Sequence, residues 1–235
     1  CPAIEAVRAA PDLELIAAVT QPDRRAGRRR RLTPCPAKRL AEERGIPVYT
    51  PENIGDSSFQ SDLADLRPDL LIVADYGQYI PRRVTEYPPM GAINIHPSLL
   101  PRWRGAAPLR RAIEAGDSVT GVTILYVSED MDAGDILLQK ETPIGPEETI
   151  LELEPRLAAL GARWVVEAAR RLGKGASDSR PQEEANATWA PKIEKSEGWI
   201  DWTQDARVLH NRIRAFLKWP GSTCFAPDGN RAKVW

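Results

Sequence analysis

The residues that could carry a reaction are concentrated between Asn94 and Gly105. The run from Ala92 to His96, which opens this segment, is typical of a strand. Residues two apart in a strand project to the same face, so Asn94 and His96 share one side. An amide can donate to a developing oxyanion, and an imidazole can move a proton or donate as an imidazolium. The pair therefore suits acyl transfer, although spacing alone favours a turn-capping asparagine and a structural histidine.

A carboxylate that could accompany this pair lies in the acidic, glycine-containing loop from Glu129 to Asp135. Asp132 in this loop could orient His96 and favour its cationic form. The alternative is a solvated turn, which is the preferred interpretation for Glu129, Asp130 and Asp135. Spacing alone does not separate Asp132 from these neighbours.

Several common reaction types are excluded because their motifs are missing. No G-x-G-x-x-G follows a strand and no G-x-x-x-x-G-K-[ST] is present, so the usual dinucleotide and P-loop sites lack support. The chain has only two histidines, His96 and His210, which excludes an H-E-x-x-H zinc site. The G-x-S-x-G nucleophile elbow of serine hydrolases is also absent.

The elements that must position these side chains alternate along the chain. Predicted strands cover residues 13–19, 70–74, 92–96, 119–127 and 135–140. Predicted helices cover residues 4–10, 37–44, 108–115 and 150–172, and the basic residues 24–31 are predicted to form a loop. This alternation predicts an α/β fold with helices on both faces of the sheet. Asn94 and His96 then lie at the carboxyl end of a strand, where open α/β sheets bind ligands.

The composition of the whole chain indicates which broad class of protein it belongs to. With 235 residues it is long enough to bury a substantial core, and its net charge is −1. Its three cysteines are far apart and form no C-x-x-C, which argues against a disulfide framework and indicates a reducing, cytoplasmic location. The apolar runs are too short to span a membrane. The near-neutral charge hides a local excess, because residues 24–39 contain eight Lys or Arg and no acid.

The composition changes after residue 172. Residues 173–184 are rich in Gly, Ser, Asp and Pro and predict a surface linker. A further helix is predicted at residues 207–216, followed by a strand, a turn and a strand up to residue 235. We therefore divide the chain into a catalytic domain at residues 1–172, a linker at 173–201 and the beginning of a second domain at 202–235.

Motifs distributed in order along the chain give a family resemblance. They are Gln21-Pro22-Asp23-Arg24, Ala26-Gly27-Arg28, Tyr76-Gly77 with Pro81, the segment from Asn94 to Pro108, Thr120-Gly121-Val122-Thr123, Asp132-x-Gly134-Asp135, Ile200-Asp201-Trp202 and Lys233-Val234-Trp235. Over nearly the whole chain, these motifs resemble the methionyl-tRNA formyltransferases, a family of folate-dependent formyltransferases. The Asn-x-His and Asp signals alone would fit any folate-dependent formyltransferase. The basic stretch and residues 103–108 narrow the resemblance to enzymes that act on initiator tRNA.

The resemblance implies a role for individual residues. Catalysis would fall to Asn94, His96 and Asp132, folate binding to Ser98, Leu99, Leu100 and Pro101, and tRNA binding to Arg24, Arg28, Arg29, Arg30 and Arg31. The implied reaction moves a formyl group from 10-formyltetrahydrofolate to the α-amine of methionyl initiator tRNA. It implies no metal, no membrane and no obligate protein partner. The implied fold is a Rossmann-like formyltransferase domain with a mainly parallel sheet, a linker, and the start of an OB-like C-terminal β-barrel.

Three features depart from the family pattern. An opening strand with its Gly-Thr-Pro-x-Phe-Ala loop is absent, the barrel is present only as its first helix and hairpin, and Asp75 replaces a small apolar residue before Tyr76. We expect the missing strand to leave a gap between residues 13–19 and 70–74, with unpaired backbone groups on both sides. The chain alone is then expected to be poorly soluble and weakly active. The third departure is expected to alter the folate pocket.

Other functions remain open on the residues alone. Amino-sugar N-formylation, glycinamide ribonucleotide formylation and formyl-tetrahydrofolate hydrolysis use the same fold and catalytic residues, but their substrates give no reason for a basic stretch. A different class is a non-catalytic RNA-binding module, in which arginines bind phosphate and Trp103 stacks on a base. The arginines could also form a solvated loop without a ligand.

Overall fold

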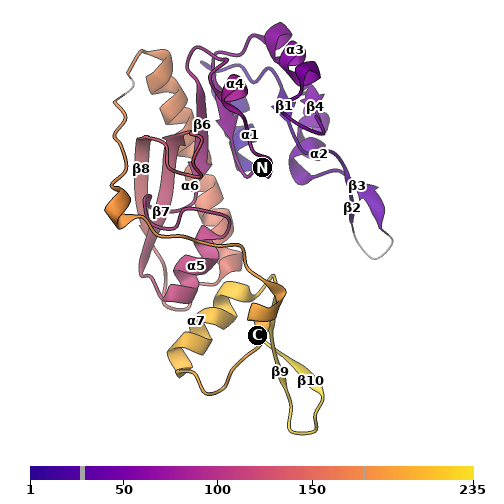
Figure 1. The fold of residues 1–235 in the computed structure, drawn as a ribbon, viewed down its shortest axis with the longest axis vertical. Coiled ribbons are helices and arrows are strands. Elements are labelled where there is room, and N and C mark those ends of the chain that lie inside the picture. Colours follow the sequence, from indigo (N-terminus) through magenta and orange to yellow (C-terminus); the bar gives the residue numbers. More distant parts are fainter. Residues whose placement is uncertain (27–29, 177) are drawn as a thin grey trace.

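The computed structural model describes residues 1–26, 30–176 and 178–235, and Figure 1 shows the arrangement of its elements. In chain order, these are α1 (Pro2–Ala9), β1 (Ala18–Val19), β2 (Arg24–Ala26), β3 (Arg31–Thr33), α2 (Pro36–Glu43), β4 (Val48–Tyr49), α3 (Ser57–Leu66), β5 (Leu71–Val73), α4 (Arg82–Thr85), β6 (Ala92–His96), α5 (Pro108–Ala115), β7 (Val119–Tyr126), β8 (Ile136–Pro143), α6 (Ile150–Gly173), η1 (Glu184–Asn186), η2 (Lys195–Gly198), α7 (Ala206–Phe216), β9 (Ser222–Phe225) and β10 (Arg231–Val234). Within the described chain, no helix combines the length and apolar character needed to cross a membrane.

The largest sheet has four strands in the order β5-β6-β7-β8. β5 and β6 are parallel, whereas β7 runs antiparallel to both β6 and β8. β6 is therefore hydrogen-bonded on both sides. This double pairing fixes the direction in which the side chains at its carboxyl end project.

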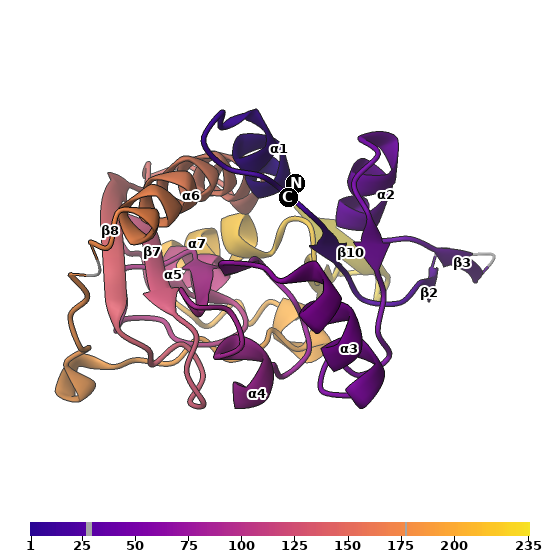
Figure 2. The ribbon, with the colours of Figure 1, turned by 90° about the horizontal axis from the view of Figure 1, so that it is seen from above.

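A second, two-stranded sheet contains β1 and β4 in parallel. Among the described residues, β1 and β5 belong to separate sheets and share no backbone ladder. Apolar contacts connect the two sheets, because Val19 of β1, Tyr49 of β4 and Leu71 of β5 pack against the same cluster of buried residues. Val7 of α1 packs with Val166 of α6 and with Ile72 of β5. Viewed from above, α1 lies beside α6 (Figure 2).

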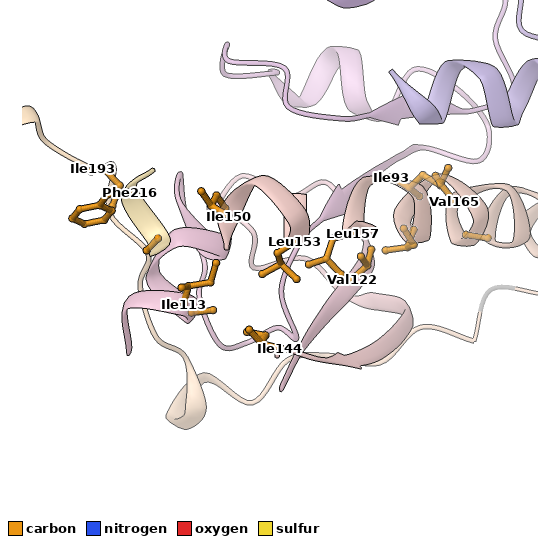
Figure 3. Close-up of a cluster of buried hydrophobic side chains, with 14 of the residues drawn as sticks. Ile93, Ile113, Val122, Ile144, Ile150, Leu153, Leu157, Val165, Ile193 and Phe216 are labelled. Carbon is orange, nitrogen blue, oxygen red and sulfur yellow. The ribbon is translucent and has the colours of Figure 1, made fainter. Parts of the chain in front are cut away.

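The main core joins α5, α6 and α7 to the four-stranded sheet (Figure 3). α6 begins with a capping box, in which the Glu152 carboxylate accepts a hydrogen bond of 2.9 Å from the Thr149 N–H. Further along, a Cβ atom at Gly161 would lie 2.6 Å from Cγ2 of Ile95. Only glycine therefore lets α6 approach β6 this closely, and the helix supports the strand that carries Asn94 and His96.

The C-terminal part is packed into the same core. Ala215 and Phe216 of α7 are buried in the cluster that contains Ile113 and Ile150 (Figure 3). The buried Arg214 donates 2.8 Å to the carbonyl of Glu148, which ties α7 to the start of α6. Beyond α7, β9 and β10 form an antiparallel hairpin.

The α/β, Rossmann-like fold class is confirmed, and two local predictions are corrected. The strand expected at residues 13–19 is reduced to Ala18–Val19. The predicted loop at residues 24–31 is wrong at residues 24–26 and 31, because Arg24 pairs with Thr33, Arg25 with Leu32 and Ala26 with Arg31 in the antiparallel hairpin of β2 and β3. Residues 27–29 of this prediction lie outside the described residues. In an exposed two-stranded ribbon, charged side chains extend into water, so charge does not prevent strand formation.

Candidate active site

The structure brings together Asn94, His96 and Asp132. Asn94 and His96 come from one strand, β6, whereas Asp132 comes from the loop between β7 and β8. Oδ1 of Asp132 lies 3.4 Å from Nδ2 of Asn94 and 3.4 Å from Nδ1 of His96. Two residues on one strand face thus share one carboxylate from a neighbouring loop.

Asp132 is held in an unusual conformation. Its φ is +54°, a left-handed value that is uncommon outside glycine and is tolerated by Asp. Its other oxygen, Oδ2, accepts a hydrogen bond of 2.9 Å from the Gly105 N–H. Two residues later, a Cβ atom at Gly134 would lie 1.9 Å from the Tyr126 carbonyl oxygen, so this turn requires glycine.

The environment of Asp132 keeps its carboxyl ionised. Burial raises the pKa of this group, but the hydrogen bond and charge of His96, the Gly105 N–H and the charge of Arg104 outweigh that effect. The net result is a pKa below the ordinary value for Asp. An ionised acceptor therefore faces Asn94 and His96.

His96 is almost fully buried, and both of its ring nitrogens face oxygen atoms. Nε2 lies 2.8 Å from the carbonyl oxygen of Trp103, and Nδ1 faces Asp132. A doubly protonated imidazolium can donate to both acceptors at once. The geometry thus accommodates a positive charge on this ring.

The loop that supplies the Trp103 carbonyl is fixed from one side by Asp117. Its carboxylate accepts hydrogen bonds from Arg102 at 2.6 Å and 3.1 Å and from Nε1 of Trp103 at 2.8 Å. The guanidinium of Arg102 also lies over the indole ring, 4.5 Å from its centroid. These contacts hold Trp103 at a left-handed φ of +65°.

The segment from Ser98 to Pro101 is anchored by Thr123 of β7. The Thr123 hydroxyl donates 2.7 Å to the Ser98 carbonyl and accepts 3.1 Å from the Leu100 N–H. Gln139 of β8 adds a bond of 2.7 Å from Nε2 to the Leu100 carbonyl. Ser98 and Leu100 are buried, whereas Leu99 and Pro101 are partly exposed.

Three of the five arginines predicted to bind tRNA are described in the structure, and these three do not join this cluster. Arg24, Arg30 and Arg31 are exposed on or beside the β2–β3 hairpin, which projects away from the four-stranded sheet (Figures 1 and 2). Arg28 and Arg29 lie outside the described residues. The hairpin therefore forms a separate basic surface.

Asp75 follows β5 and has a left-handed φ of +52°. Burial of the carboxyl, with a smaller effect from the negative charge of Glu154, raises its pKa. The predicted influence of this residue on a folate pocket stays a prediction.

Two further residues near the site were not assigned a role from the sequence. Arg104 is almost fully buried and donates to both Gln182 and Glu184. Gln182 donates 2.8 Å to the carbonyl of Asp132. No motif singles out Gln182, because it lies in the segment whose composition indicates a linker.

Sequence comparison reveals close relatives. Residues 4–169 match the family model described as formyl transferase, and residues 192–235 match the C-terminal domain of formyl transferase. A methionyl-tRNA formyltransferase of Marinobacter nauticus is 48% identical over 209 residues, which cover 89% of this chain and 67% of the relative. The methionyl-tRNA formyltransferase of Aromatoleum aromaticum is 48% identical over 220 residues, covering 94% of this chain and 69% of the relative.

Solved structures share the fold. A 4-N formyltransferase from Francisella tularensis has a TM-score of 0.73 at 17% identity, covering 98% of this chain and 89% of that chain. HypX from Aquifex aeolicus in complex with tetrahydrofolic acid has a TM-score of 0.63 at 24% identity, covering 80% of this chain and 32% of that chain. At these identities the likeness concerns the fold alone. The family match and the close sequence relatives go further: this chain belongs to the methionyl-tRNA formyltransferase family.

Proposed function

We propose that this chain transfers the formyl group of 10-formyltetrahydrofolate to the α-amine of methionyl initiator tRNA, for the initiation of translation. The observation that carries the proposal is the shared contact of Asn94 and His96 with the Asp132 carboxylate. The relatives named methionyl-tRNA formyltransferase support the choice of acceptor. The division into a catalytic domain at residues 1–172, a linker at 173–201 and a second domain from 202 is part of the proposal.

In the proposed reaction, the α-amine nitrogen attacks the formyl carbon on N10 of the folate, and a tetrahedral oxyanion forms. Asn94 donates to this oxyanion, and protonated His96 stabilises its negative charge. Asp132 holds the imidazole and assists transfer of the amine proton to N10 as the bond between the formyl carbon and N10 breaks. The products are formylmethionyl-tRNA and tetrahydrofolate. These protein groups supply the whole of the proposed step, without a metal.

Among the contacts of the described residues, one N–H of the Asn94 amide is left over for this task. Its amide carries two N–H groups, and its contact with Asp132 is long at 3.4 Å. One N–H can therefore keep the carboxylate in place while the other meets the oxyanion. The same contact orients the amide before the substrate arrives, which lowers the cost of reorganisation.

The folate would lie against Ser98, Leu99, Leu100 and Pro101. Thr123 and Gln139 fix the backbone of this segment, so it offers a rigid edge beside the catalytic residues. The buried side chains of Ser98 and Leu100 serve the fold. Contact with the folate then falls to the segment's backbone and to Leu99 and Pro101.

The basic hairpin would bind the tRNA. Arg24, Arg30 and Arg31 extend from it into solvent, and Arg28 and Arg29 belong to the same stretch of sequence. Guanidinium groups bind phosphate, and an exposed ribbon can reach a large polyanion. An amino-sugar or nucleotide acceptor would not need such a surface.

The test is an assay of the products. The chain is incubated with 10-formyltetrahydrofolate and methionyl initiator tRNA, and formylmethionyl-tRNA and free formate are measured in parallel. We expect formylmethionyl-tRNA as the product. Formate released at the same rate without tRNA would identify a hydrolase, and tRNA binding without either product would identify an RNA-binding module.

A further inference from the structure

Residues 180–190, here called the bridging segment, cross the candidate active site between the two regions that match the family models. At one end, Arg180 exchanges two backbone hydrogen bonds of 2.8 Å and 3.0 Å with Ile136 at the start of β8. At the other end, the Ala190 N–H donates 2.7 Å to the carbonyl of Arg104. The segment therefore connects the loop that carries Asp132 with the loop that follows Leu100.

Gln182 makes the most direct of these connections. Its Nε2 donates 2.8 Å to the carbonyl of Asp132 and 2.8 Å to the carbonyl of Gly134. Its Oε1 accepts from Nε and Nη2 of Arg104 at 3.1 Å and 2.9 Å. One amide side chain thus joins the backbone of the Asp132 loop to the guanidinium of Arg104.

The bridging segment holds Arg104 at its backbone N–H, its carbonyl and its guanidinium. Within the described chain, every hydrogen bond of these groups is to this segment. The Arg104 N–H donates 2.8 Å to the Thr188 carbonyl, and its carbonyl accepts from Ala190. Its guanidinium donates to Gln182 and, at 2.6 Å and 2.9 Å, to the Glu184 carboxylate. The Arg104 side chain is almost fully buried and that of Gln182 is partly buried, whereas the Glu184 carboxylate is exposed to solvent. The bonds to Gln182 are therefore the better shielded from water.

The neighbours of Arg104 on both sides contact the catalytic candidates. The carbonyl of Trp103 faces Nε2 of His96, and the N–H of Gly105 donates to Asp132. Moving Arg104 would therefore move both of these backbone partners. Gln182 controls the same geometry from two directions, through Arg104 and through the Asp132 backbone.

We propose that Gln182 is a positioning residue of the active site, and that the bridging segment is a structural part of that site. The inference rests on the proposed function, since it concerns the reaction assigned to Asn94, His96 and Asp132. Gln182 acts on the reaction by setting the distance between Asp132 and His96. The Ser98–Pro101 segment is anchored by Thr123 and Gln139 and by the Thr188 N–H, which donates 3.2 Å to the Pro101 carbonyl. None of these bonds involves the Gln182 side chain, so the segment keeps its anchors when Gln182 is replaced.

The variants Gln182→Ala and Gln182→Glu test the inference. Alanine removes all four hydrogen bonds, whereas glutamate can still accept from Arg104 but cannot donate to the two carbonyls. We expect both to lower kcat by about 10- to 100-fold, since a displacement of about 1 Å can cost that much. The KM for 10-formyltetrahydrofolate should stay within about twofold, because an interaction that acts only in the transition state changes kcat and not the binding of the ground state.

The matched control is Gln204→Ala, which changes an exposed glutamine outside the bridging segment whose only side-chain hydrogen bond in the described structure is a long one of 3.4 Å from Arg212. It should leave both kcat and KM unchanged. All rates are measured well below the melting temperature of each variant, so that unfolding does not enter kcat. If Gln182→Ala and Gln182→Glu retain the full kcat, or if KM rises while kcat is kept, the inference is wrong.

A double-mutant cycle separates positioning from general loss of structure. Gln182→Ala is combined with Asp132→Asn, and the loss in kcat is compared with the product of the two single losses. A clearly smaller combined loss supports action through Asp132, whereas the full product overturns it. If the unmodified chain forms no formylmethionyl-tRNA, the proposed function fails, and that result is distinct from every outcome above.

Discussion

Asn94 and His96 face one carboxylate because side chains two residues apart in a strand project to the same side. The two side chains differ in solvent exposure. His96 is buried and both its nitrogens face acceptors, whereas Asn94 is partly exposed and makes one long contact. At the residue scale, the group best placed to meet a substrate oxygen is therefore the Asn94 amide. In the proposed reaction, the His96 imidazole stabilises the charge that develops on this oxygen.

Asn94→Ala is expected to slow single-turnover formylation of methionyl initiator tRNA by about 10²–10³-fold, the usual effect of removing one oxyanion donor. The measurement is the rate of formylmethionyl-tRNA formation with enzyme in excess over tRNA. Asn186→Ala, an exposed asparagine hydrogen-bonded to Glu183, is the control and should keep the full rate. A near-normal rate for Asn94→Ala would remove this residue from the mechanism.

Thr123 and Thr120 offer a comparison within one strand. The Thr123 hydroxyl joins Ser98 and Leu100, whereas the buried Thr120 hydroxyl has no hydrogen-bond partner within the described part of the chain. Thr123→Val should cost about 1–3 kcal/mol of stability and raise the KM for folate, because it leaves buried groups unpaired. Thr120→Val should be neutral or stabilising, since no bond is lost. Urea unfolding and steady-state kinetics check both; equal costs for the two variants would contradict the assigned anchor.

The sequence predicted that Asn94 and His96 form a pair because both lie on one strand, and the two-residue repeat of a strand is enough to place them on the same face. It could not separate Asp132 from Glu129, Asp130 and Asp135. The difference between these acids lies in a left-handed φ and in a hydrogen bond from Gly105, which is 27 positions away. The sequence could not identify Gln182 either, because its hydrogen-bond partners lie in two loops that are distant in the sequence.

At the scale of elements, β2 and β3 pair only with each other among the described strands, and Arg24, Arg25 and residues 30–33 are exposed. The loop prediction failed at β2 and β3 because a run of arginines shows no apolar pattern, although its backbone forms hydrogen bonds between the two strands. The strands of the main sheet were easier to predict, since residues 70–74 form an apolar run and residues 92–96 alternate apolar and polar side chains toward their end. The short β1 was overestimated because its flanking leucines pack against helices instead of extending the strand.

Replacing five arginines of the basic stretch with Gln should weaken tRNA binding; they are Arg24, Arg28, Arg29, Arg30 and Arg31. Each lost phosphate contact lowers the slope of log Kd against log salt by about 0.7–0.9, so the slope should flatten. Folate binding should be unchanged. The measurement is tRNA affinity over a salt series, with Arg171→Gln on α6, a residue paired with Glu167, as the control. An unaltered salt slope would favour a solvated hairpin without a ligand.

At the scale of the whole molecule, Glu197 connects the C-terminal part to α5. Its carboxylate accepts from Arg111 at 2.7 Å and 3.1 Å, and this hydrogen bond outweighs the effect of burial and lowers the pKa of Glu197 below its ordinary value of 4.5. A carboxyl with a lowered pKa in the folded state stabilises the fold above that ordinary value. The contribution is lost as the pH falls through the folded-state pKa.

Glu197→Gln should therefore lower the melting temperature at pH 7 by roughly 2–4 °C, which corresponds to about 1 kcal/mol for a chain of this size. The difference between the two proteins should persist down to about pH 5 and shrink below the ordinary pKa of 4.5. Thermal melts from pH 7 to pH 3 measure it. A difference that grows on acidification would contradict the sign of the pKa shift.

The bridging segment also constrains how the length of the chain can vary. Its ends are bonded to Ile136 and Arg104, so the number of residues between Arg180 and Ala190 is set by the distance it must cover. Gly175, by contrast, has open space around its Cα and follows the end of α6. Insertions accumulated during divergence can therefore be accommodated beside Gly175, whereas a single inserted residue in the bridging segment would shift Gln182 relative to both loops it joins.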